Sequence, residues 1–173
     1  MIKKIRFEIQ PNGYAEMAHL EFFNNGTALK VDLNARTLTL KSGEVINITA
    51  NASSEYSGYY AIGCFNTTDS PTHSSGCWCS ATGSGEKCWV EIEFETAIPK
   101  GFANKLTFCC GQSHGSYPAT YTLFFIDENG DSEQIGQPLY VEAHNGVFEW
   151  VSVIRCFVGK DGLHYFLRPE VKI

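Results

Sequence analysis

Basic clusters, long apolar runs and charged side chains are all scarce in this sequence. Only 18% of the 173 residues are charged, and 19 acidic against 13 basic residues give a formal net charge of −6. The one local basic cluster, Lys3-Lys4-Ile5-Arg6, is too short for a nucleic-acid-binding face, so we expect no nucleic-acid partner. No run approaches the roughly 20 apolar residues of a membrane-spanning helix, so we also expect no membrane insertion.

A cleaved secretion leader is not apparent either. The first seven residues begin basic but then alternate between apolar and polar side chains, where a signal peptide would enter a continuous apolar stretch. We therefore expect a protein made in the cytoplasm without a signal peptide. Release by cell lysis would then be its way out, as it is for virion components.

The chain contains seven cysteines, Cys64, Cys77, Cys79, Cys88, Cys109, Cys110 and Cys156. An odd number without a leader favours reduced thiols over a disulfide framework. Zinc is the alternative, because several of these thiols could meet His73 or His114 in space. Their spacing does not match the paired ligands of zinc knuckles, so we expect most of them to be buried as small apolar side chains.

Alternation of apolar and polar residues with a period of two predicts β-strands in much of the chain. The segments that show it are 5–9, 18–23, 38–40, 45–49, 89–94, 106–110, 121–126 and 139–141. Turn sequences such as Asn24-Asn25-Gly26 and Asn129-Gly130 follow two of them. No segment of ten or more residues has a convincing helical period. This pattern predicts an all-β fold, an antiparallel sandwich or barrel.

Three segments depart from that alternation. Residues 50–88 are rich in Ser, Thr, Gly, Asn and Cys and have no usable period, and residues 111–118 form a shorter second loop. A long polar stretch inside a compact domain usually binds something. Residues 148–158, a turn at 159–162 and residues 163–167 predict a terminal β-hairpin.

Four segments occur in an order that resembles a known family. They are IKKIRFEI with AEMAHLEFFNNG (2–9 and 15–26), SSEYSGYYAIGCFNTTDSPTHSSGCWCS (53–80), CWVEIEFETAIPKGFANKLTF (88–108) and YPATYTLFFIDENGD (117–131). Together they resemble discoidin-like domains, also called coagulation-factor type C or galactose-binding-like domains. The resemblance spans about residues 3–142. Residues 2–26 precede the segment 53–80, and this order resembles the order found in phage tail and bacterial surface proteins.

The resemblance implies an antiparallel jelly-roll β-sandwich of about eight strands over residues 1–146, with binding loops at one end and no catalysis. Carbohydrate is the usual ligand of such loops. Residues 147–173 would be a C-terminal β-hairpin extension that completes a sheet or contacts another subunit. Trp78 and Trp89 match positions that pack the core of the family.

A structural calcium ion is also implied by the resemblance, with Asn66, Asp69 and Glu21 as candidate ligands. The sequence departs from the family here, because Phe65-Asn66-Thr67 stands where Phe-Asp-Gly is expected. Calcium prefers about six to eight oxygen ligands with several carboxylates, so this loss weakens the site.

Sugar-binding chemistry points to the two polar loops. A sugar stacks its C–H face on an aromatic ring, and planar polar groups hydrogen-bond its hydroxyls. The candidate ligand-binding residues are His114, Tyr117, Gln112, His73, Tyr56 and Trp78, of which Trp78 has the core as its alternative. For Tyr60 we expect a place in the core.

No catalytic constellation is apparent. Glu91 and Glu93 point the same way from one strand, as on a solvated face, and no basic residue accompanies Cys109-Cys110 to activate a thiol. We expect a non-catalytic module that binds glycan or cell-surface polysaccharide, associated with a virion as a phage tail or capsid decoration protein in host adhesion. The alternative is a purely structural virion assembly protein that forms oligomers through its C-terminal strands.

Overall fold

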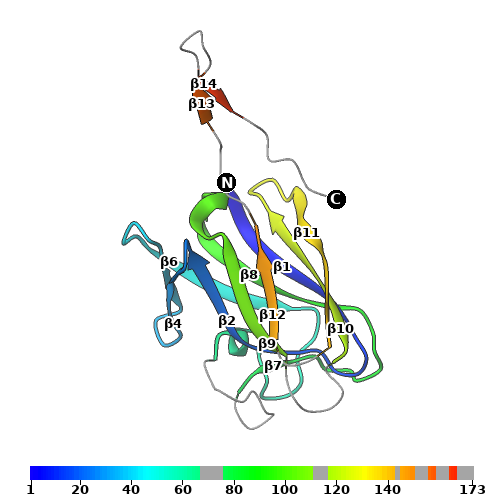
Figure 1. Cartoon of the computed structure of the whole chain (residues 1–173). Helices are drawn as coiled ribbons and strands as arrows, with labels where there is room; N and C mark the ends of the chain where they lie inside the picture. Colours follow the sequence, from blue (N-terminus) through cyan, green and yellow to red (C-terminus); the bar gives the residue numbers. More distant parts are fainter. Residues whose placement is uncertain (67–75, 111–116, 143–144, 151–155, 159–163, 167–173) are drawn as a thin grey trace.

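The structure is a computed structural model that describes residues 1–66, 76–110, 117–142, 145–150, 156–158 and 164–166, the last two segments by their backbone alone. Two antiparallel sheets face each other with apolar side chains between them (Figure 1). The expected all-β antiparallel sandwich is therefore confirmed. In the part of the chain that the structure describes, no helix is long and apolar enough to cross a membrane.

The larger sheet has seven strands. Their spatial order is β11 (Ser132–Val141), β10 (Ala119–Ile126), β1 (Ile2–Pro11), β8 (Cys88–Ile98), β6 (Val45–Ala52), β5 (Thr37–Thr39) and β4 (Lys30–Asp32). The first strand of the chain lies near the middle of the sheet because it pairs with β10 and β8, which come far later in the sequence.

The smaller sheet has five strands. They are β12 (Asn145–Glu149), β9 (Lys105–Cys110), β2 (Glu16–Asn24) and β3 (Thr27–Ala28), with β7 (Trp78–Cys79) also paired to β2. The boundary expected between residues 146 and 147 falls inside β12, so residues 147–149 belong to this sheet. The backbones of β13 (Cys156–Val158) and β14 (His164–Phe166) pair with each other as a separate two-stranded sheet.

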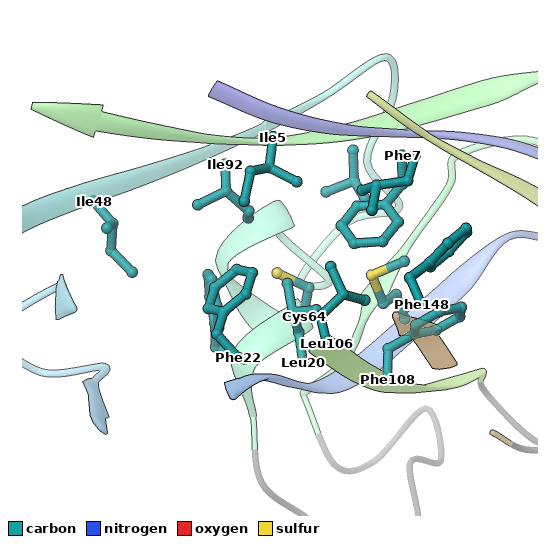
Figure 2. Close-up of a cluster of buried hydrophobic side chains, with 14 of the residues drawn as sticks. Ile5, Phe7, Leu20, Phe22, Ile48, Cys64, Ile92, Leu106, Phe108 and Phe148 are labelled. Atoms are coloured by element: carbon teal, nitrogen blue, oxygen red, sulfur yellow. The ribbon is translucent and has the colours of Figure 1, made fainter. Parts of the chain in front are cut away.

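Aromatic and branched side chains from both sheets fill the space between them (Figure 2). Phe7 of β1 meets Phe108 of β9 with ring centroids 5.8 Å apart, and Phe108 lies 4.6 Å from Tyr121 of β10. Phe148 of β12 stacks on Phe108 at 6.2 Å. Each such side chain stabilises the fold by about 1.5–3 kcal/mol through the apolar surface that it removes from water.

Part of the long polar segment is folded against this core. A 3-10 helix, η1 (Ala61–Phe65), buries Cys64 and Phe65, and Cys64 points between the sheets (Figure 2). A second 3-10 helix, η3 (Lys100–Phe102), follows β8 and buries Phe102.

Two aromatic residues expected in the core lie outside it. Trp89 is only half-buried, because its neighbour Val90 points into the core and successive residues of a strand point to opposite faces. The guanidinium of Arg6 covers its ring at 4.8 Å. Tyr60 directly precedes η1, and 61% of its surface is exposed.

The prediction that Glu91 lies on a solvated face is wrong. It does face outward from β8, but only 3% of its surface is exposed, because two basic side chains of β1 cover its carboxylate. Lys4 Nζ donates to Glu91 Oε1 at 2.9 Å and Arg6 Nη2 donates to Oε2 at 2.6 Å. The hydrogen bond to Glu91 raises the pKa of Lys4.

Candidate functional site

One end of the sandwich gathers described loop residues, among them parts of the polar segment that the sequence marked for binding (Figure 1, lower end). The pairing registers bring six strand ends together there, since Pro11 lies opposite Ala119, Met17 opposite Cys110, and Ala52 opposite Val90 near the start of β8. We call this end the loop end. Two rigid sheets therefore hold residues 12–15, 53–60 and 80–87 next to one another.

A tight turn presents two tyrosines at the loop end. Residues 56–59 reverse the chain with Gly58 at a φ of 89°, a conformation that glycine adopts without steric cost. The Tyr59 amide donates to the Tyr56 carbonyl at 2.9 Å, and the Tyr56 amide donates to the Cys79 carbonyl at 2.8 Å. The two rings lie 5.9 Å apart, and 42% of the Tyr56 surface is exposed.

A third tyrosine extends this group. The ring of Tyr14 lies 6.1 Å from that of Tyr56, edge to face. Gly83 packs against Tyr14 so closely that an added Cβ would lie 2.2 Å from its Cε2 atom. We call Tyr14, Tyr56 and Tyr59 the tyrosine cluster. The sequence analysis identified Tyr56 as a ligand candidate but missed Tyr14, whose role depends on contacts with residues far along the chain.

Trp78 is a core residue and not a ligand contact. Its surface is fully buried, and its indole nitrogen donates to the Ser54 carbonyl at 3.2 Å. The prediction of a binding role for Trp78 is therefore wrong, because its position in β7 opposite Met17 points it between the sheets. Its hydrogen bond ties the 53–60 loop to the core.

The other predicted contacts divide into two groups. Tyr117 is half-buried and packs against the core, directly before Pro118, to which it is joined by a cis peptide bond. His73, Gln112 and His114 lie outside the described residues.

The predicted calcium ligands are only partly placed. The backbone carbonyl of Asn66 accepts a hydrogen bond from the His19 amide at 2.9 Å, and the side chain of His19 lies 3.6 Å from Glu21. Asn66 and Glu21 are thus joined through His19, whereas Asp69 lies outside the described residues. Among the residues that are described, no three His, Cys, Asp or Glu side chains form a group that could hold a metal ion.

Burial keeps the thiols protonated. The six cysteines with described side chains are free, and all but Cys109 are buried, as expected for small apolar side chains. Burial raises the pKa of Cys88 to about 12 and that of Cys110 to about 11. Because the thiolate is the form that attacks substrates, these pKa values disfavour a nucleophilic role for the two thiols.

A buried carboxylate accompanies two of these thiols. Glu16 of β2 has no exposed surface and lies opposite Cys79 in the sheet. Burial, with the Glu16 carboxylate as a further cause, raises the pKa of Cys77 to about 11 and that of Cys79 to about 12. This burial could not be read from the sequence, because Glu16, Met17 and Ala18 are all buried in succession at the start of β2.

Comparison with known proteins finds no matching family model, no matching curated protein and no matching solved structure. The resemblance to discoidin-like domains therefore rests on the sequence segments that carry it. The class that the structure itself defines is an antiparallel β-sandwich with an aromatic cluster among the loops at one end.

Proposed function

We propose that this protein is a non-catalytic module that binds carbohydrate at its loop end. The observation that carries the proposal is the tyrosine cluster, which combines a strongly exposed ring, that of Tyr56, with a turn fixed by backbone hydrogen bonds. A ring held in this way can stack on the C–H face of a sugar without losing further conformational freedom on binding.

Polar groups for the sugar hydroxyls lie beside the rings. Ser57 between the two tyrosines and Thr82 and Ser84 next to Gly83 are all exposed. Loops on a rigid sheet scaffold are a common place for such sites, because they vary without disturbing the core. The raised thiol pKa values support a binding role over thiol catalysis.

The finer parts of the proposal follow from the resemblance. We propose that the sandwich is a jelly roll of the galactose-binding-like kind and that the protein acts in host adhesion as part of a virion. A structural calcium ion held by Asn66, Asp69 and Glu21 belongs to the same proposal.

A glycan array followed by calorimetric titration tests carbohydrate binding. We expect Tyr56→Ala to weaken binding to a glycan identified on the array by tenfold or more. Tyr140→Ala is the matched control, because Tyr140 is also strongly exposed (59%) but lies on β11 outside the cluster. Binding by Tyr56→Ala that is as tight as that of the wild type, or an array without any specific glycan, would refute the proposal. Repeating the titration with a calcium chelator tests the metal.

Assembly through the C-terminal strands is the second candidate. The observation that favours it is the pairing of β13 with β14 as a two-stranded sheet, which the described residues do not join to either sheet of the sandwich (Figure 1). An isolated two-stranded hairpin is marginally stable in water, so a partner would stabilise it. Light scattering of the full chain and of Phe157→Asp tests this, since the charge would shift an oligomer toward monomer. A wild-type monomer would refute it.

A further inference from the structure

A hollow lies away from the tyrosine cluster, on the outer face of the five-stranded sheet. It has a volume of about 390 Å³ and is lined by side chains of β2, β9 and β12, among them His19, Glu21, Thr107, Cys109 and Asn145. This volume falls in the lower part of the range of about 300–1,000 Å³ that small-molecule sites occupy.

A β-bulge shapes the hollow. The pairing of β2 with β9 shifts between Ala18 and Glu21, so that two residues of β2 stand opposite one of β9. His19, the first of the two, has a φ of 52°, which is uncommon for a residue other than glycine. The bulge lets Leu20 point into the core while His19 and Glu21 both reach the hollow.

The polar groups in the hollow have hydrogen-bonding capacity left over. The Cys109 thiol donates to Asn145 Oδ1 at 3.1 Å, which leaves both amide protons of Asn145 without a partner among the described residues. The Thr107 hydroxyl likewise has no hydrogen bond within the described part of the chain. A hydroxyl, an amide and a carboxylate therefore converge as donors and acceptors.

Each of the two carboxylates in and around the hollow has a nitrogen group close to it. His19 Nε2 lies 3.6 Å from Glu21 Oε2, and 28% and 37% of the two side chains are exposed. Next to them on the same face, Lys105 Nζ lies 3.4 Å from Glu149 Oε1. A phosphate would meet the Glu21 carboxylate, and an organic cation would have to displace the His19 ring from beside that carboxylate. A neutral ligand rich in hydroxyls meets neither obstacle.

We propose that this hollow is a second carbohydrate site, which takes a neutral sugar residue through its hydroxyls. Thr107 and Asn145 bind the hydroxyls as donors, and Glu21 accepts from a pair of them. The inference keeps carbohydrate as the class of ligand, as in the proposed function, and adds a second site for it. This second site does not depend on the tyrosine cluster. Two sites on one domain would raise the avidity for a repeating surface polysaccharide without new contacts at either site.

Two-dimensional ¹H–¹⁵N NMR of the full chain tests the second site. The probes are glucose, galactose, mannose, rhamnose, N-acetylglucosamine and N-acetylgalactosamine, each titrated separately. We expect at least one sugar to shift the amide signals of Thr107, Cys109 and Asn145 saturably. Thr107→Val, which keeps the branched shape of the side chain, should weaken this binding three- to tenfold, about the effect of one hydrogen bond.

Two variants separate this site from the tyrosine cluster. Thr49→Val removes an exposed hydroxyl from the outer face of the other sheet and should change nothing. Tyr56→Ala should leave the shifts in the hollow intact.

The outcomes separate the two sites. Saturable shifts only around Tyr14 and Tyr56 would overturn the second site and leave the proposed function standing. Shifts only in the hollow would support the second site and overturn the proposal for the loop end. Shifts at neither place with any of the six sugars would overturn both.

Discussion

Aromatic side chains gather in two regions of this protein, between the sheets and at the loop end, and different interactions hold them there. Phe7, Phe108 and Phe148 are almost wholly buried and come from three strands whose alternation points them inward. Tyr14 and Tyr56 come from loops, keep exposed surface and depend on a turn and on a neighbouring glycine for their position. Aromatic surface thus stabilises the fold in the first region and is left accessible to a ligand in the second.

Removing one ring from each region gives the largest contrast. Phe108→Ala deletes a side chain that touches Phe7, Tyr121 and Phe148, and we expect it to lower the free energy of unfolding by about 3–5 kcal/mol. Tyr56→Ala should change it by less than about 1 kcal/mol, because part of that ring is already in water. Urea denaturation followed by fluorescence measures both. Equal losses would show that the tyrosine cluster is part of the core.

Gly63 tests how tightly the polar segment is fixed to the core. A Cβ at this position would lie 2.2 Å from the Gly76 carbonyl oxygen and 2.9 Å from the Cys77 carbonyl carbon, both backbone atoms. We expect Gly63→Ala to destabilise the protein by about 1–3 kcal/mol, because backbone cannot move aside as a side chain can. Gly130→Ala is not a suitable control, since its φ of 89° adds strain of its own.

Ser84→Ala is the control instead, because Ser84 is exposed and lies outside the core cluster. Thermal unfolding of the two variants gives the comparison. A midpoint for Gly63→Ala that equals that of Ser84→Ala would contradict the close packing of η1.

The buried thiols make the fold sensitive to alkaline pH. The pKa of Cys88 rises from its ordinary value of 9.0 to about 12, so the folded state keeps a proton that the unfolded state loses. The stabilisation is complete below pH 9 and is lost as pH rises toward 12, by about 1.4 kcal/mol per pH unit for each such thiol. Urea titrations at pH 7.0, 9.0 and about 10.5 should show the decline, and Cys88→Ala should make it shallower. An unchanged slope would argue against burial of this thiol.

Substitution of Gly83 should have the smallest effect on the free energy of unfolding but a clear effect on glycan binding at the loop end. Its added Cβ would overlap the ring of Tyr14, which can rotate, so we expect Gly83→Ala to change the free energy of unfolding by no more than about 0.5 kcal/mol. The displaced ring would no longer pack on Tyr56, and glycan binding at the loop end should weaken several-fold. Tyr140→Ala, outside the cluster, is again the control in calorimetric titration. Intact binding by Gly83→Ala would exclude Tyr14 from the site.

Local alternation was enough to find the central strands. The segments 5–9, 89–94, 106–110 and 121–126 lie within β1, β8, β9 and β10. Short strands were missed, because β3 and β7 have two residues each and cannot show a period. Most of β11 was missed as well, since this edge strand is largely exposed and therefore polar on both faces.

Alternation gives the face of a residue but not what covers it. Glu91 does face outward, yet Lys4 and Arg6 from the neighbouring strand bury it. The bulge at His19 has a related origin, because the extra residue is defined only by the pairing of β2 with β9. The same limit explains why Tyr14 was missed in the candidate site.

By itself, the sequence determined the class of fold, the position of its main strands and the polar segments that lie outside those strands. These properties follow from the period of two and from turn residues, which act between neighbours in the chain. The tertiary structure alone decided the order of the strands, the burial of Glu16 and Trp78 and the meeting of Tyr14 with Tyr56. Each of these depends on contacts between residues distant in sequence. Such contacts form, and stabilise the fold, only when both sheets have packed.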